Sequence, residues 1–210
     1  MTAVDCSPEM REQVEAFRDK VEAELEQEDV RWDWQVAAGN EGQGLARQVA
    51  LNDLAIVGGS VAGSLAIHCR TPVLVMPDSA RSFTADGPAA VCWNGSIEAA
   101  RALRCAVPLL AGASAVHVLS VGDPLSESED KLAAIAAADY LARHDIVCEI
   151  VELPRGSEPV HELLFHAARA RKAAFMVMGA YGQPRIVETL FGGVTKGVLA
   201  SPAMPVLMAH

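Results

Sequence analysis

Four glycines follow an apolar run in the second half of the chain, and their spacing indicates a loop that can hold an anion. The run Ala173 to Met178 has the composition of a buried strand, and it leads into Gly179 and Gly182, with the pair Gly192 and Gly193 further along. Glycine has no Cβ, so the main-chain N–H groups of such a loop can approach a negatively charged oxygen closely. The predicted chemistry is capture of a phosphate rather than catalysis.

Residue types that form catalytic centres are not grouped in this sequence. No Ser/His/Asp or Cys/His grouping falls at a predicted strand end, and no pair of carboxylates accompanies the glycine loop, so we predict that the protein is not an enzyme. The acidic cluster at 123–130 could suggest Mg²⁺, but negative charge at a helix start is expected from the helix dipole alone. His161 and His166 are five residues apart, which does not place both rings on one helix face, so we predict packing or surface positions for them and no metal site.

The charge and the cysteines restrict the partners and the compartment. A formal net charge of −10 without a basic stripe argues against nucleic acid and anionic membranes. The apolar stretch from Leu54 to Ile67 is interrupted by glycines and serines and is shorter than the ~20 residues of a membrane-spanning helix. Residues 1–5 do not resemble a signal sequence. Five cysteines without a C-x-x-C pattern predict reduced thiols, and we expect a cytoplasmic protein.

From Pro88 onward, strands are expected to alternate with helices, as in a doubly wound α/β sheet. The predicted strands are 89–93, 115–121, 146–152, 173–178 and 205–208. Four helices should connect them: one capped by Ser96, one opened by the capping box of Ser126 and Glu129 and ending near residue 144, one starting at 157–159, and one starting at Pro184.

Residues 1–78 repeat only the later elements of this series. We expect an amphipathic helix over 8–25, a strand over 30–36, a helix over 41–50, a strand over 54–57, a short helix, and a final strand over 72–76. Segments 54–58 and 175–179 are similar to each other, as are 71–76 and 204–208. This internal repeat predicts an incomplete unit at 1–78 that lacks the glycine loop and the first strands, a linker at 79–87, and a complete domain at 88–210.

Together these residues resemble the universal stress protein family in its tandem, two-unit form. The resemblance rests on the segment Trp93-Asn94-Gly95-Ser96, on the spacing of Gly179, Gly182 and Gly192, and on the closing run 205–208. It covers 88–210 fully and 5–78 in part. It implies an adenine nucleotide alpha hydrolase-like fold, in which a five-stranded parallel sheet has the strand order 3-2-1-4-5, here preceded by a partial copy of the same unit.

The resemblance also implies a ligand and a set of binding residues. Many members bind ATP or another adenine nucleotide, and Mg²⁺ could accompany it here. By position, Asn94 and the backbone of Val121 would face adenine and ribose. The phosphates would be surrounded by Gly179, Gly182, Gly192 and Gly193, with Arg185 and Lys196 as counter-charges. The chain has Gly193 where ATP-binding members carry Ser or Thr, so Thr195 is the residue that could supply a hydroxyl.

Two functions lead the alternatives from the sequence, and a third, a nucleotide-hydrolysing or transferring enzyme, would require turnover that is abolished by altering Asn94 or Gly182. The first is a non-catalytic, nucleotide-binding stress-response or signalling module, in which ATP hydrolysis would be slow and incidental. The second is a family member that no longer binds nucleotide and acts as a scaffold or in protein–protein interaction. The sequence does not identify the nucleotide, the signal or the protein partners.

The incomplete unit leaves an unpaired position in its part of the sheet. Either the segment 30–36 moves to pair with 54–57, or another chain supplies the missing surface, because unpaired edges invite association. We expect a homodimer, formed through the closing strands 72–76 and 205–208, which could also pair within one chain, or through the incomplete unit.

Overall fold

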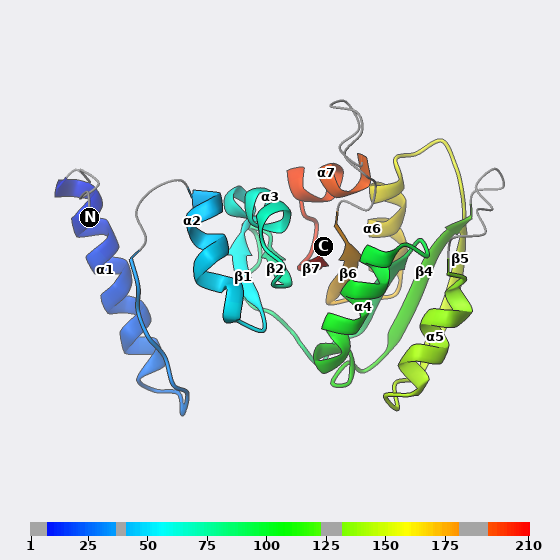
Figure 1. Cartoon of the computed structure of the whole chain (residues 1–210), viewed down its shortest axis with the longest axis horizontal. Coiled ribbons are helices and arrows are strands. Elements are labelled where there is room, and N and C mark those ends of the chain that lie inside the picture. Colours follow the sequence, from blue (N-terminus) through cyan, green and yellow to red (C-terminus); the bar gives the residue numbers. More distant parts are fainter. Residues whose placement is uncertain (1–7, 37–40, 123–131, 181–192) are drawn as a thin grey trace.

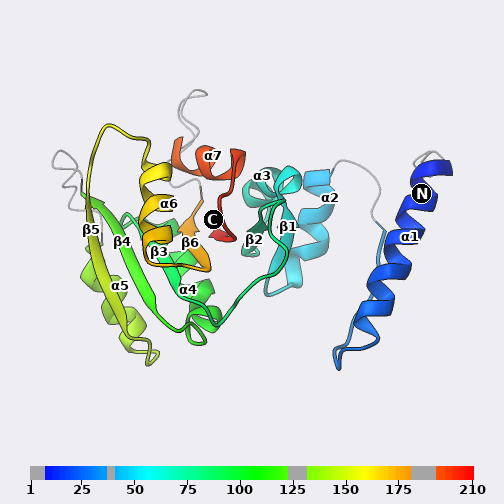
Figure 2. The ribbon, with the colours of Figure 1, turned by 180° about the vertical axis from the view of Figure 1, so that it is seen from behind.

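The computed structural model of the chain describes residues 8–36, 41–122, 132–180 and 193–210, and these form one twisted sheet with helices on both faces (Figures 1 and 2). The strands are β1 (Ala55–Gly58), β2 (Val73–Met76), β3 (Ala89–Trp93), β4 (Val116–Gly122), β5 (Cys148–Pro154), β6 (Phe175–Gly179) and β7 (Val206–Ala209). They stand in the order β1-β2-β7-β6-β3-β4-β5.

The sheet therefore has seven strands, and the prediction of a five-stranded sheet is wrong. The five strands of residues 88–210 do adjoin one another in the expected order, 3-2-1-4-5 from β5 to β7. The two additional strands, β1 and β2, extend the sheet beyond β7. Every neighbouring pair is parallel except β2 and β7.

The antiparallel pair joins the two parts of the chain. Val73 lies opposite Met208 and Val75 lies opposite Val206, so the predicted closing strands pair within one chain. Each of these strands also has a second neighbour, β1 for β2 and β6 for β7. Since both edges of β2 and of β7 are occupied, a homodimer through these strands would require the sheet to open.

The helices are α1 (Pro8–Leu25), α2 (Glu41–Gln48), α3 (Gly59–His68), α4 (Ile97–Leu110), α5 (Ala134–Ala142), α6 (Val160–Ala170) and α7 (Gly193–Ala200), with a 3₁₀ turn at Val49–Leu51. Helices α4 and α5 pack on one face of the sheet, while α2, α3, α6 and α7 pack on the other.

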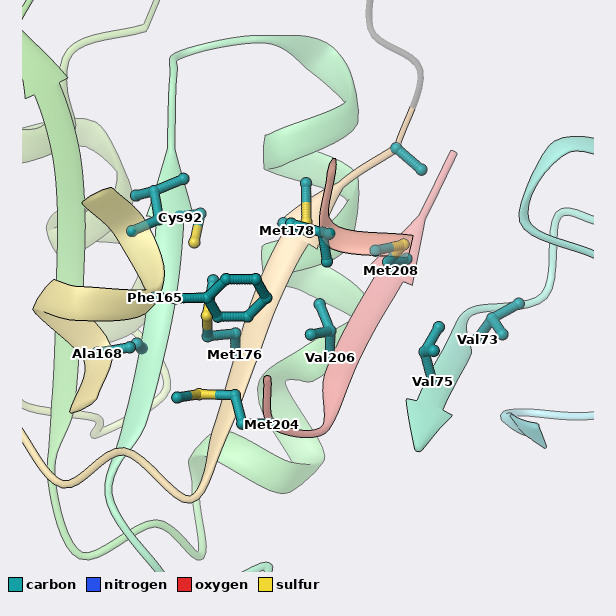
Figure 3. Close-up of a cluster of buried hydrophobic side chains, with 14 of the residues drawn as sticks. Val73, Val75, Cys92, Phe165, Ala168, Met176, Met178, Met204, Val206 and Met208 are labelled. Carbon is teal, nitrogen blue, oxygen red and sulfur yellow. The ribbon is translucent and has the colours of Figure 1, made fainter. Parts of the chain in front are cut away.

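Parallel strands covered on both faces should be apolar throughout, and the central strands are. All five residues of β3 are buried. Alternate residues point to the two faces: Ala89 and Val91 join the cluster under α4, and Cys92 joins the cluster under α6. Figure 3 shows this second cluster, in which Phe165 of α6 lies among methionines from β6, β7 and the chain before β7.

The predicted strand at 30–36 does not form. These residues follow α1 without regular structure and lie beside it, where the rings of Phe17 and Trp34 are 5.9 Å apart. A strand requires a hydrogen-bonded neighbour, and β1 has only β2 as its partner among the described residues. The alternative in which this segment pairs with 54–57 in the same chain is therefore wrong.

One helix start differs from the prediction, and another lies where the prediction is not tested. The helix before β5 begins at Ala134, and Leu132 and Ala133 are not helical; the capping box at Ser126 and Glu129 lies outside the described residues. The expected start at Pro184 is likewise outside them, and the described part of α7 begins at Gly193. In the described ranges no helix is both long and apolar enough to span a membrane.

Candidate functional site

Three of the predicted binding residues meet at one edge of the sheet. Asn94 follows β3, Val121 is near the end of β4, and Gly179 ends β6. These parallel strands are neighbours, so their carboxyl ends lie at the same edge. From β3 the chain proceeds to β4 on one side, whereas from β6 it proceeds to β7 on the other. Such a reversal of strand order is where open α/β sheets bind ligands.

A tight turn after β3 holds Asn94 in place. The Oδ1 atom of Asn94 accepts a hydrogen bond from the main-chain N–H of Ser96 at 3.1 Å. Gly95 between them has a φ of 75°, a conformation that favours glycine. Ser96 then caps α4, because its Oγ accepts from the N–H of Ala99 at 3.1 Å. Asn94 is exposed, and its Nδ2 group has no partner among the described residues, so it can donate to a ligand.

The main chain of Val121 lies at the end of the β3–β4 ladder. The β3–β4 ladder ends where Trp93 pairs with Ser120. Strand β4 continues through Val121 and Gly122, whose residue partners in the described part of the chain are in β5. The side chain of Val121 is partly buried against the α6 face. A flat ring placed beyond β3 could therefore contact both an apolar side chain and the main chain at the end of β4.

Gly179 has a packing role that the sequence interpretation missed. A Cβ atom at this position would lie 2.5 Å from the main-chain nitrogen of Ala99 and 2.6 Å from the carbonyl carbon of Glu98. The first turn of α4 thus rests directly on Gly179. The next amide, of Ala180, donates to the carbonyl oxygen of Ala209 at 2.9 Å. The described start of the glycine loop is therefore used by helix packing and by the sheet rather than left free for an anion.

The other residues that were predicted to contact phosphate belong to α7 or precede it in the sequence. Gly193 opens the described part of α7 and is exposed, and a Cβ added to it would meet no atom within 4 Å beyond its chain neighbours. Lys196 is exposed, whereas Thr195 is only 5% exposed. The side chain of Thr195 is therefore buried and not open to solvent. Gly182, Arg185 and Gly192 lie outside the described residues.

Two contacts near these strand ends were not predicted. The indole Nε1 of Trp93 donates to the carbonyl oxygen of Leu132 at 2.9 Å, and the N–H of Leu132 donates to the carbonyl oxygen of Gly95 at 3.1 Å. The chain entering α5 is thereby fixed beside the turn that holds Asn94. A buried tryptophan needs an acceptor for its N–H, which is the only sequence signal for this contact.

The structure confirms the prediction that His161 has a packing role. Its ring occupies the space beside Gly197 of α7, where an added Cβ atom would overlap Nδ1 of the imidazole. Glycine at this position allows α6 and α7 to approach each other. His166 is exposed, and its Nδ1 lies 3.2 Å from Oε2 of Glu158.

The cysteines of the described ranges show no sign of a reactive site. Burial raises the pKa of the Cys92 thiol to about 12, and burial is also the main cause of the raised pKa values of Cys69 and Cys148. A raised pKa keeps a thiol protonated and unreactive. No group of three or more potential metal-ligating side chains occurs in the part of the chain that the structure describes.

A shallow surface pocket of about 450 Å³ lies elsewhere, between α5 and the start of β5. Its lining residues are Ala138, Asp139, Ala142, Asp145, Ile146, Val147 and Cys148. This is the amino end of β5, whereas the predicted residues lie at carboxyl ends. The strand ends provide the converging polar groups and the reversal of strand order, and so we place the candidate site there.

Comparison with known proteins identifies related sequences and folds. The sequence pattern of the Universal stress protein family matches residues 88–210. The fold is similar to that of a universal stress protein from Archaeoglobus fulgidus DSM 4304, with 18% identity and a TM-score of 0.70, over 98% of this chain and 80% of that chain. A functionally unknown protein from Pseudomonas aeruginosa PAO1 is also similar, with 20% identity and a TM-score of 0.60, over 93% and 77% of the two chains. No curated protein matches this sequence.

A universal stress protein crystallised in complex with cAMP matches as well, with 21% identity and a TM-score of 0.44, over 60% of this chain and 99% of that chain.

Proposed function

Since the chain belongs to the universal stress protein family, we propose that it is a stress-response protein that binds an adenine nucleotide, ATP or a related one, at the carboxyl ends of β3, β4 and β6. The binding would regulate the protein or report a signal, without turnover of the nucleotide. We place this activity in the cytoplasm, consistent with buried, protonated cysteines and the absence of a C-x-x-C pattern.

The observation that carries this proposal is the reversal of strand order between β3 and β6. Because of this reversal, the chain leaves β3 toward one side of the sheet and leaves β6 toward the other. A ligand can lie between two connections that diverge in this way. The polar groups beside it suit the base and sugar of a nucleotide. Asn94 can donate through Nδ2, and the main chain of Val121 at the end of the β3–β4 ladder would lie beside the base.

The phosphates would lie toward the chain between β6 and α7. Gly193, the first described residue of α7, is exposed, and glycine allows a negatively charged oxygen to approach its main-chain N–H closely. Lys196, one turn further, can supply a positive charge. We propose binding without catalysis because the described residues at the three strand ends bring no nucleophile next to a base.

We further propose that residues 1–78 are an incomplete second unit of the same family. The two pairs of similar segments form β1 and β2 in one part and β6 and β7 in the other. Both pairs are parallel, and the two closing strands meet in an antiparallel pair. Two related units placed face to face about a two-fold axis would produce this arrangement.

Isothermal titration of the full chain with ATP, ADP, AMP and cAMP tests nucleotide binding. Asn94→Asp keeps the acceptor for the N–H of Ser96 and adds a carboxylate for ribose hydroxyls. A hydrogen bond to a charged group contributes about 1.5–3 kcal/mol, so we expect affinity to rise roughly 10–100-fold. Asn94→Ala should weaken binding, while Asn52→Ala, an exposed change outside the site, should leave it unchanged.

Absence of heat with both the natural chain and Asn94→Asp would reject nucleotide binding. The second function, a scaffold that no longer binds nucleotide, would then be favoured. It has support of its own: Gly179 is covered by the first turn of α4, and the hydroxyl-bearing side chain of Thr195 is buried. Mass spectrometry of small molecules released from freshly purified protein would check the same choice independently.

A further inference from the structure

The first described residues, 8–36, form an arm that has little contact with the rest of the molecule. Helix α1 and the segment 30–36 lie side by side at one end of the structure, with α2 between them and β1 (Figures 1 and 2). Several large apolar side chains of this arm are exposed, namely Phe17 at 60%, Val30 at 57%, Trp32 at 40% and Val36 at 68%. Such a concentration of exposed apolar groups marks an interaction surface.

Trp34 gives a second, independent sign that the packing of the arm is incomplete. Its indole Nε1 is buried but has no hydrogen-bond partner among the described residues. A buried N–H without an acceptor is destabilising, and native structures rarely leave one. An arrangement that brought a main-chain carbonyl to this indole would remove the cost.

Strand β1, the edge strand of the sheet, has main-chain groups that face no neighbouring strand among the described residues. The N–H of Ala55 donates to Pro72, on the β2 side. Groups on neighbouring residues of a strand point to opposite sides, so the N–H and C=O of Ile56 face the free edge. The side chain of Ile56 is 64% exposed, while Ala55 is buried under α3 on the other face. Among the described residues, this edge therefore has neither a neighbouring strand nor a helix over Ile56.

The arm contains the two elements that this edge lacks. In segment 30–36 the apolar residues Val30, Trp32, Trp34 and Val36 alternate with Arg31, Asp33 and Gln35, which is the pattern of a half-buried strand. Helix α1 carries Val14, Phe17, Val21 and Leu25 at helical spacing. If segment 30–36 paired with β1 and α1 lay over Ile56, the exposed apolar side chains of the arm and the side chain of Ile56 would be buried together.

We propose that a second copy of this chain provides the arm, so that two copies exchange arms: segment 30–36 of each pairs with β1 of the other, and α1 covers Ile56. A reciprocal exchange closes with two-fold symmetry and leaves no free surface for further growth. In the single chain the segment lies on α1, not on β1.

The distribution of charge favours this contact over one between two arms. Residues 8–36 carry ten acidic and four basic side chains, so two arms would repel each other. Residues 41–78, which include β1, carry three acidic and two basic side chains and are close to neutral. An arm therefore meets less repulsion on the β1 edge than on another arm. This inference does not depend on nucleotide binding.

Sedimentation velocity of the full chain at micromolar concentration is the first test, and we expect a dimer. An edge variant, Ile56→Lys, places a charge on the exposed edge and should give a monomer. Val147→Lys is the matched control, because Val147 is 90% exposed beside the opposite edge strand; this variant should remain a dimer. An arm variant, Trp32→Lys with Val36→Lys, should also be monomeric.

Mixing the two disabled chains distinguishes arm exchange from any other dimer. The edge variant retains a competent arm and the arm variant retains a competent edge, so an equimolar mixture should form a heterodimer with one exchanged arm. In the natural dimer, amide hydrogen exchange of 30–36 and 55–58 should be slow, and it should become fast in either variant alone.

Three results would overturn the proposal: a monomer with slow exchange at 30–36, which would mean that each arm docks on its own sheet; a monomer with fast exchange; and a dimer that survives the edge and arm substitutions. If the edge variant fails to fold, the arm variant decides, because its altered residues are exposed and lie outside the sheet.

Discussion

Replacing Gly179 with alanine should destabilise the protein strongly, because the first turn of α4 leaves no room for a Cβ atom. The nearest atoms would be the nitrogen of Ala99 at 2.5 Å, the carbonyl carbon of Glu98 at 2.6 Å and Cβ of Glu98 at 2.9 Å. Two of the three are backbone atoms, so a change of rotamer cannot relieve the clash. The whole turn must shift, and the capping bond from Ala99 to Ser96 would be strained with it.

The expected loss of stability is the sum of the overpacking cost and the cost of straining the N-cap of α4. Overpacking a tight contact costs about 1–3 kcal/mol, and loss of an N-cap bond costs about 1 kcal/mol, giving roughly 2–4 kcal/mol in the free energy of unfolding. For a protein of this size that corresponds to a fall in Tm of about 4–16 °C. Urea unfolding and thermal melts monitored by circular dichroism would measure it.

Gly44→Ala is the matched control, since Gly44 lies within α2 and a Cβ added there meets nothing within 4 Å. Alanine there should raise the free energy of unfolding by about 0.5–1 kcal/mol, through its higher helix propensity. The reasoning would be refuted if Gly179→Ala were as stable as the natural protein. A glycine needed only for anion approach would give that result, with weaker nucleotide binding as the sole defect.

Further predictions concern α7 and the core. Gly197→Ala should destabilise the protein by about 1–3 kcal/mol, because its Cβ would overlap the ring of His161. Most of that loss should be absent when Gly197→Ala is introduced into the His161→Ala variant. If urea unfolding shows that the two losses are additive, the contact is contradicted. The pKa of Cys92 is raised by burial from 9.0 to about 12. The folded state therefore holds a proton that the unfolded state releases above pH 9, and stability is lost as pH rises from 9 toward 12. In reducing buffer the free energy of unfolding should fall by about 1.4 kcal/mol per pH unit more in the natural chain than in Cys92→Ala, and equal slopes would disprove it.

Much of the fold in residues 88–210 could be predicted from the sequence, because local signals and burial agree there. The strand at 89–93 forms over the predicted residues, and Ser96 caps the following helix. The segment 30–36 has an equally clear strand pattern, yet it is not a strand. A strand pattern shows which side chains could share a face, but it does not supply the neighbour that a strand must bond to.

The candidate site was predicted in its position but not in its packing. Asn94, Val121 and Gly179 do lie at adjoining carboxyl ends. The sequence did not reveal that α4 rests on Gly179 or that Thr195 is buried, because both depend on residues distant in sequence. Nor did it reveal that Trp93 binds the backbone of Leu132, since one partner of that bond is a carbonyl present in every residue.

The sequence by itself determined the α/β class, the five strands of 88–210 and the helix capped by Ser96, and the glycines and asparagine from which a phosphate or nucleotide site could be built. These are consequences of periodicity, capping and glycine chemistry, which act over a few residues. Only the tertiary structure decided that the sheet has seven strands, that β2 and β7 join in one chain, and that β1 is an edge strand while segment 30–36 stays unpaired among the described residues. These outcomes depend on which surfaces meet, and side chains remote in sequence make that choice through shape, burial and hydrogen bonding.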